Sequence, residues 1–324
     1  MQGLFLFYKP SGPSSAQFLN HVKRALLIPR DIRVGHGGTL DPFASGLLVV
    51  GVSRAYTKLL SHQLLHTTKE YRVEIILGAS SDTDDRTGII QKIPNTHEDN
   101  GVGTIQRLTS IVEWKGKIAS AIETLKNQET QTPPQYSAIK IQGKPAYTRK
   151  RAGESLSISA KKVSLLAYQI ESIQEKNDLI YITMTLVVSS GFYIRSFARD
   201  LGVLLGTGGY VNALERAKIG FFSLKNALNL DDLDKDVELH FWASGAVQNV
   251  GFRAFAQDCA QTLNITGFSR NTDENRVEII GQGKLPQLQE FLARISVGPV
   301  GSHIEFKEDW FGSVSEEYKD FSIK

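Results

Sequence analysis

The chain has 324 residues, of which 41% are apolar and 22% charged, values ordinary for a soluble globular protein with room for two domains. Its single cysteine, Cys259, excludes a disulfide framework within the chain and a cysteine-rich zinc site. No apolar run has the length of a membrane span, and the first residues lack an export signal. We therefore expect a cytoplasmic protein.

The charge is distributed unevenly along the chain. From Val237 onward, 8 Lys and Arg oppose 12 Asp and Glu, a net charge of −4, which leaves 29 against 22, or +7, for the preceding part. Only the first part is therefore suited to a polyanion such as nucleic acid.

Strand and helix signals come in groups along the first part. Gly3 to Tyr8 is apolar enough for a short strand, and Ser14 or Ser15 can cap a helix whose apolar positions run to Leu26. Later patterns predict strands over Tyr71–Leu77 and Leu179–Val188, and helices over Ile118–Leu125 and Phe197–Leu205. This grouping favours an α+β fold with a mostly antiparallel sheet over a doubly wound fold.

Two breaker-rich segments interrupt these patterns. Asn95 to Gly103 is predicted to be a surface excursion within the first domain. Asn229 to Asp236 is acidic without an apolar face, and it is the better boundary. We expect one domain over residues 1–232 and a second over 237–324, whose pattern of strand, turn, helix, two strands, helix and strand is that of a ferredoxin-like βαββαβ domain.

Residues 35–48 place one carboxylate, that of Asp41, in a glycine-rich turn before an apolar strand. Glycines admit backbone conformations that other residues avoid, and Pro42 favours an extended backbone at Asp41. An isolated Asp-Pro would merely begin a turn. A carboxylate held in this way can also be aimed at a ligand. His36 has no second histidine or cysteine at metal-ligand spacing nearby, so no metal site is predicted.

The segment from Asp82 to Gly88 carries several carboxylates in a short space. Arg86 occupies a position that a calcium loop would need for a ligand, and no glutamate follows at the required spacing. The segment is therefore predicted to be a turn.

The Asp41 segment resembles the signature of the TruB family of tRNA pseudouridine synthases. Other family segments occur in the same order, at Tyr8–Gly12, Lys69–Val73, Pro133–Lys140, and Ser190–Ser196 with Arg199–Gly202. The resemblance covers about the first 220 residues. It implies a pseudouridine synthase fold and an enzyme that isomerises uridine 55 in the T-loop of tRNA to pseudouridine, without a cofactor.

The resemblance also assigns three catalytic residues. Asp41 matches the nucleophile, which attacks either the base or the sugar. Arg195 matches the arginine that pairs with this carboxylate, orients it and lowers its pKa. Tyr71 matches the tyrosine that stacks on the target base and accepts a proton from the sugar, although a strand tyrosine can equally be a core residue.

Four further positions match substrate-binding residues of the family. Tyr193 and Leu214 match positions that line the uridine pocket, although Leu214 could be ordinary helix or core packing. His36 matches a histidine that contacts the RNA and helps to hold the flipped nucleotide. Lys9 is a candidate for a structural or phosphate contact near the site, with a solvated lysine as the alternative.

The tail resembles a second family. Ser244 to Arg253 is similar to the phosphate loop of acylphosphatases, and Gly267 to Asn271 is similar to that family's second segment. The resemblance implies that Arg253 holds the phosphoryl group and that Asn271 orients the attacking water. Asn249 stands where the family usually has glycine, so the loop must place asparagine at positive φ or shift. A competent acylphosphatase site and a degenerate interaction module are both open.

The expected partners are the T-arm of tRNA and small acyl phosphates at the tail, with no membrane contact and a monomeric chain. The tail lacks the pattern of the RNA-binding PUA domain that many family members carry there. Two alternatives are a tRNA-binding and folding protein without catalysis, and an acylphosphatase to which the first domain is merely attached.

Overall fold

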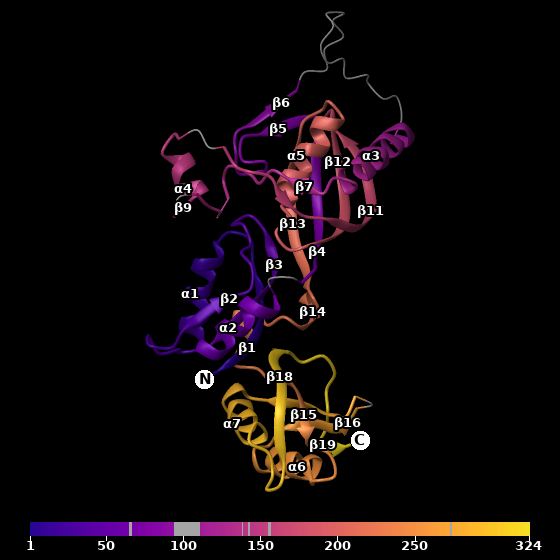
Figure 1. The fold of residues 1–324 in the computed structure, drawn as a ribbon. Helices are drawn as coiled ribbons and strands as arrows, with labels where there is room; N and C mark the ends of the chain where they lie inside the picture. The colour runs from indigo at the N-terminus through magenta and orange to yellow at the C-terminus, as the bar shows by residue number, and fades with distance from the viewer. Residues whose placement is uncertain (65–66, 94–110, 138, 142, 155–156, 273) are drawn as a thin grey trace, which may run out of the picture. The chain divides into compact units, whose positions relative to one another are not determined.

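In a computed structural model, the described residues are 1–64, 67–93, 111–137, 139–141, 143–154, 157–272 and 274–324. They belong to two compact units, one of residues 66–220 and one of residues 1–65 together with 221–324. Figure 1 shows their helices and strands, with labels where there is room. The predicted excursion at Asn95–Gly103 lies outside the described residues.

The unit of residues 66–220 is built on a four-stranded antiparallel sheet in the order β11-β12-β4-β13. The strands are β4 (Lys69–Leu77), β11 (Leu165–Lys176), β12 (Leu179–Val188) and β13 (Gly209–Ile219). Shorter elements are β5 (Ala79–Ser81), β6 (Ile90–Lys92), β7 (Thr130–Gln131), β8 (Lys140–Ile141), β9 (Lys144–Pro145), α4 (Ala146–Arg151) and β10 (Lys161–Lys162).

One face of this sheet is buried because apolar residues alternate along its strands. Tyr71, Val73 and Ile75 of β4 are buried, whereas Arg72 between them is exposed. Helices α3 (Ile111–Lys126) and α5 (Ile194–Leu204) pack together, with α3 against β11 and α5 against β13 and β4. Both strands and both helices that the sequence predicts here are confirmed.

Residues 1–65 contribute a strand hairpin and two helices to the other unit. The elements are β1 (Gly3–Lys9), α1 (Ser15–Ala25), β2 (Val34–His36), β3 (Ser45–Val52) and α2 (Arg54–Gln63), and β3 pairs antiparallel with both β1 and β2. The predicted cap is confirmed, because the Ser14 side chain accepts from the Gln17 amide and the Gln17 side chain accepts from the Ser14 amide.

The tail forms a sheet in the order β18-β15-β17-β16, with antiparallel neighbours throughout, which confirms the ferredoxin-like prediction. Helices α6 and α7 pack together beside it, and a short strand, β19, adds to its edge (Figure 1). The elements are β15 (Val237–Ala246), α6 (Phe252–Thr262), β16 (Thr266–Asn271), β17 (Arg276–Gly283), α7 (Leu285–Ile295), β18 (His303–Ser313) and β19 (Phe321–Ile323), preceded by β14 (Phe222–Ser223) and the 3₁₀ turns η1 (Leu224–Asn226) and η2 (Leu230–Asp232).

Strands β1 and β18 pair in parallel, with Phe5 opposite Phe311. The two rings stack with centroids 4.8 Å apart, and both side chains are fully buried in one core that contains residues from both segments of the unit. The compact units therefore do not divide at residue 236. The division into domains over 1–232 and 237–324 stays a prediction. Within the described residues, no helix is both long and apolar enough to cross a membrane.

Candidate active site

Asp41 opens a tight turn in which its carbonyl accepts from the Ala44 amide at 3.1 Å. This is the turn that Asp-Pro predicts, with Pro42 at its second position. Asp41 is half-buried, between the buried Leu40 and Phe43. The turn is therefore held on both sides by core residues, which limits where the carboxylate can point.

The segment that contains Lys9 holds this turn. The Lys9 ammonium donates to the carbonyls of Ala44 at 2.7 Å and Pro10 at 2.9 Å, and the side chain is fully buried. The Ser11 hydroxyl donates to the Phe43 carbonyl at 2.8 Å. The buried ammonium thus satisfies one carbonyl of the turn and one of the segment that follows β1, and both acceptors lie outside the strands. This placement fits the structural role predicted for Lys9. The alternative of a solvated lysine is wrong, because the side chain is fully buried.

Ser15 of α1 fixes the other end of the turn. Its hydroxyl donates to the Leu40 carbonyl at 2.9 Å and accepts from the Leu40 amide at 2.8 Å. The first family segment and the start of α1 are therefore the support of the Asp41 turn. Sequence spacing alone could not show this contact.

The glycines around Asp41 serve two purposes. Gly38 and Gly46 have φ values of 96° and 111°, which favour glycine. A Cβ on Gly37 would instead collide with the side chain of Leu64. His36 directly precedes Gly37 at the end of β2, half-buried and opposite Val50 of β3.

In the other unit, Tyr71 and Leu214 share the buried face of the sheet. Leu214 lies opposite Val73, and Arg216 lies opposite Tyr71, on neighbouring strands. Tyr71 and Leu214 are 7% and 8% exposed. Leu214 is on strand β13, so the helical alternative for this residue is wrong.

Arg216 is a fully buried cation that is not among the residues predicted from the sequence. Burial, together with the positive charge of Arg216, lowers the pKa of Lys69 to about 8. Lys69 belongs to the same family segment as Tyr71, and its ammonium contacts the Ser190 hydroxyl at 3.3 Å. The tyrosine therefore lies on a strand whose start is bordered by two cations.

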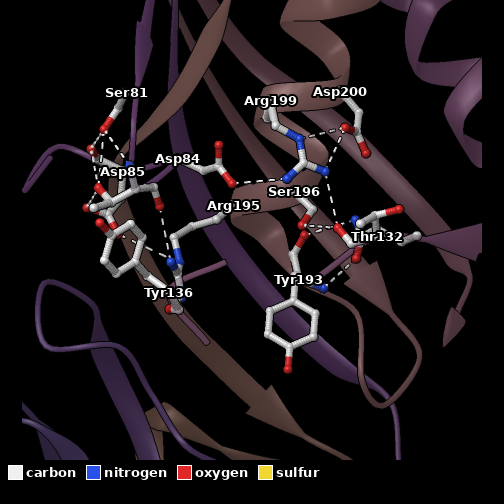
Figure 2. Close-up of polar contacts among 12 residues, drawn as sticks. Ser81, Asp84, Asp85, Thr132, Tyr136, Tyr193, Arg195, Ser196, Arg199 and Asp200 are labelled. Carbon is white, nitrogen blue, oxygen red and sulfur yellow. Dashed lines mark hydrogen bonds and ion pairs between the residues drawn. The ribbon is translucent and has the colours of Figure 1, made fainter. Parts of the chain in front are cut away.

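Arg195 occupies a pocket of fixed acceptors beside the first turn of α5. Its guanidinium donates to the carbonyls of Thr83 at 3.1 Å and Tyr136 at 3.0 Å, and its Nε lies 3.7 Å from Oδ2 of Asp85 (Figure 2). The side chain of Arg195 is 5% exposed. A buried guanidinium with several acceptors is held in one orientation.

Asp85 is the buried anion beside Arg195, in a segment that the sequence predicts only to be a turn. Its Oδ1 accepts from the amide of Thr87 at 2.9 Å, from the Thr87 hydroxyl at 2.5 Å and from the Thr83 hydroxyl at 2.9 Å. The segment Asp82–Gly88 is indeed a turn, as predicted. The signal for its role was the alternation of threonine and aspartate, which supplies donors for one carboxylate.

Tyr193 precedes α5 as its N-cap residue. Its amide donates to the Gln131 side chain at 2.8 Å, and the Gln131 amide group donates back to the Tyr193 carbonyl at 3.0 Å. Its ring points away from the contacts drawn in Figure 2. The start of α5 is thus fixed while the ring is directed elsewhere.

Asp41, His36 and Lys9 belong to one compact unit, whereas Tyr71, Tyr193, Arg195 and Leu214 belong to the other. Within these units, Lys9 holds the Asp41 turn, and Tyr71 lies on the same sheet face as Leu214. The pairing of Asp41 with Arg195 stays a prediction. No group of three or more histidine, cysteine, aspartate or glutamate side chains in the described part of the chain is arranged to hold a metal ion.

The tail loop adopts the first of the two conformations predicted for it. Asn249 has φ 60°, so asparagine takes the left-handed conformation that a glycine would adopt easily. Gly251, at φ 75°, is the N-cap residue of α6, and Arg253 lies in the first turn of that helix. The loop therefore leads directly into a helix N-terminus, where backbone amides attract anions.

Arg253 and Asn271 lie on neighbouring elements. The hydroxyl of Ser269 on β16 contacts the Arg253 carbonyl at 3.3 Å, and Asn271 follows two residues later on the same face of the strand. The Arg253 guanidinium donates to the Lys324 main-chain oxygen at 3.2 Å. The loop, the arginine and the asparagine are thus grouped beside the start of α6.

Comparisons with known proteins assign both parts of the chain. The family model described as TruB family pseudouridylate synthase (N terminal domain) matches residues 23–194, and the acylphosphatase model matches residues 239–323. A tRNA pseudouridine synthase B of Corynebacterium diphtheriae is 40% identical over 234 residues, which cover 72% of this chain and 73% of that protein. One from an Arthrobacter species is 32% identical over 82% of this chain and 81% of its own.

A chain of a Cbf5-Nop10-Gar1 complex has a similar fold, with a TM-score of 0.50 and 18% identity over 94% of this chain and 84% of its own. The pseudouridine synthase fold is therefore confirmed, and the C-terminal residues are an acylphosphatase-like domain. The chain belongs to the TruB family of pseudouridine synthases.

Proposed function

We propose that this protein isomerises uridine 55 in the T-loop of tRNA to pseudouridine. The reaction breaks the glycosidic bond, turns the base and forms a carbon-carbon bond, so it needs neither a redox partner nor a phosphate donor. The observation that carries the proposal is the supported Asp41 turn in a chain 40% identical to a tRNA pseudouridine synthase B. Asp41 would act as the nucleophile.

The other site residues have supporting roles in this proposal. Arg195 would pair with the Asp41 carboxylate and keep it ionised, because a guanidinium with fixed acceptors is already oriented. Tyr71 would stack on the flipped uracil, with Tyr193 and Leu214 around it. His36 would contact the RNA, and Lys9 would hold the turn.

The substrate would be bound mainly through its backbone. Lysine and arginine of the basic first part would contact phosphates of the T-arm, while the shape of the folded loop and the flipped base would give specificity. The protein would act as a cytoplasmic monomer.

The test is to incubate unmodified tRNA with wild type and with Asp41→Asn, and to map pseudouridine by carbodiimide labelling. We expect product at position 55 from wild type and none from Asp41→Asn. A transcript with cytidine at position 55 is the matched substrate control. The non-catalytic alternative holds instead if wild type forms no product and if wild type and Asp41→Asn promote tRNA folding equally well.

A second activity is proposed for the tail, the hydrolysis of small acyl phosphates. Its supporting observation is Asn249 at φ 60° in a loop that leads into α6 beside Arg253. Arg253 would hold the phosphoryl group and Asn271 would orient the water. Benzoyl phosphate hydrolysis by wild type and Arg253→Ala tests this site. Equal rates would leave the tail as an interaction module.

A further inference from the structure

Arg199 lies one helical turn after Arg195 on α5 and joins three segments of its unit. Its guanidinium donates to Oδ2 of Asp84 at 3.1 Å, to Oδ1 of Asp200 at 3.0 Å and to the carbonyl of Thr132 at 3.1 Å. Figure 2 shows it between the two carboxylates. A planar fork with three directed acceptors fixes their relative positions, which an ammonium could not do.

Asp84 lies between Thr83 and Asp85, which both contact Arg195. The Thr83 carbonyl accepts from the Arg195 guanidinium, and the Asp85 carboxylate lies beside it. The Asp84 carbonyl accepts from the Val211 amide at 3.1 Å, which ties the turn to β13. A displacement of Asp84 would therefore also move its two neighbours, the Thr83 carbonyl and the Asp85 carboxylate, which are two of the groups that orient Arg195.

The conformation of Asp84 is costly. Its φ is 60°, in the left-handed region, and its side chain is only 13% exposed. Burial raises the pKa of its carboxyl to about 6, although Arg199 and Arg195 oppose the rise. Strained backbone and desolvated charge persist where the surrounding contacts enforce them, and they are concentrated at functional sites.

The pair also lines a cavity of about 400 Å³ whose wall includes Tyr136 and Lys150. The Tyr136 carbonyl is the third acceptor of Arg195. Arg199 and Asp84 thus connect the two segments that carry these acceptors of Arg195: the turn that contains Asp84, and the chain from Thr132 to Tyr136.

We propose that the ion pair of Asp84 and Arg199 is a positioning device that holds the acceptors of Arg195 in place for the isomerisation. The proposal rests on the proposed function, since only that function gives Arg195 a role at the reacting site. In this role neither residue needs to touch the substrate. The pair acts by keeping the guanidinium of Arg195 where a displacement of about 1 Å would slow the reaction many fold.

The test compares Asp84→Asn, Arg199→Lys and the double variant with wild type, in single-turnover reactions on tRNA from pH 5.5 to 8. Glu171→Gln is the matched control, because it also replaces an ion-paired carboxylate by an amide, at an exposed pair with Arg72 in the same unit. Filter binding of tRNA and circular dichroism report affinity and folding.

Asp84→Asn is expected to react about tenfold more slowly than wild type at pH 7.5 with unchanged tRNA affinity. Wild type should lose activity as Asp84 protonates near pH 6, and this inflection should be absent from Asp84→Asn. The charged groups around Asp84 are Arg195, Arg199 and Asp200 of α5, Asp82 of the turn and Lys150 of α4. Arg199→Lys keeps the charge without the fork, so a smaller loss is expected.

Because the pair acts as a unit, the double variant should be no slower than the slower single variant. The inference is overturned if Asp84→Asn matches Glu171→Gln at every pH, if the loss lies in tRNA affinity, or if the two losses simply multiply. An inactive wild type would overturn the proposed function first, and the inference with it. That result is distinguishable because it needs no variant.

Discussion

The hydroxyl of Tyr56 lies 2.7 Å from both carboxylate oxygens of Asp309, although 253 positions separate the two residues in the chain. Tyr56 belongs to α2, and Asp309 belongs to β18 of the acylphosphatase-like domain. Both side chains are buried, and Lys307 is 4.0 Å from the same carboxylate. The contact fastens the acylphosphatase-like domain to the first segment of the chain.

Replacing Tyr56 by phenylalanine should cost about 2 kcal/mol in the free energy of unfolding at pH 7, because it removes a hydrogen bond from a buried carboxylate. Burial already raises the pKa of Asp309, and Tyr56 opposes that rise. The ionised form is therefore the one that needs Tyr56, and the loss should shrink as the pH falls and Asp309 becomes protonated. Urea unfolding at pH 5 and pH 7 measures the loss of stability and its dependence on pH.

Tyr168→Phe is the control for this prediction, since the Tyr168 hydroxyl donates to the Glu123 carboxylate at 2.9 Å on the surface. Its cost should stay below about 0.5 kcal/mol. A Tyr56→Phe protein as stable as this control would show that Asp309 is satisfied without the tyrosine.

Replacing Asp85 by asparagine should destabilise the unit of residues 66–220 by about 3 kcal/mol, because Arg195 would lose its buried anion. Pseudouridine formation should fall as well, since the guanidinium would then be held by carbonyls alone. Chemical unfolding and single-turnover kinetics check the two effects. Wild-type values for both would contradict the assigned role of Asp85.

Asp84 gives a pH prediction with a definite sign. Its pKa is about 6 in the folded protein against an ordinary value of 3.8, so the folded state binds the proton more tightly. Between about pH 4 and pH 6 the contribution of Asp84 to stability must therefore decrease as the pH rises, by about 3 kcal/mol in all. Below this window the contribution is fully present.

Asp84→Asn removes that dependence. The variant should gain stability relative to wild type as the pH rises from 4 to 7, even though it is expected to be the slower enzyme. Unfolding curves of both proteins across this range measure the difference, in which titrations common to both cancel. A constant difference would mean that Asp84 keeps an ordinary pKa.

The loop conformation at Asn249 predicts different effects for two substitutions. Asn249→Gly should retain benzoyl phosphate hydrolysis, because glycine adopts φ 60° without strain. Asn249→Ala should lose about 1 kcal/mol of stability and slow hydrolysis, since alanine resists this conformation. Asn264→Ala, at φ 53° outside the loop, should lose similar stability but keep hydrolysis. Equal hydrolysis rates for all three variants would mean that the activity does not depend on the conformation of the loop.

The sequence alone determined most of the secondary structure. Leu179–Val188 is a strand because it is rich in residues that favour strands, and α1 begins at Ser15 because Ser14 and Gln17 can cap it; both depend on neighbours a few positions apart. The ferredoxin-like tail followed from the same local patterns in sequence order. The family motifs supplied the candidate residues, since a motif records which residue types must recur together.

What only the tertiary structure decided are contacts between distant residues. The burial of Lys9 against Ala44, the place of Asp85 beside Arg195 and the pairing of β1 with β18 each join positions that no local pattern relates. Local propensity and spacing act over a few residues, whereas these contacts form only when packing brings remote segments within hydrogen-bond distance. The sequence therefore determined which side chains are available, and packing decided which of them hold one another in place.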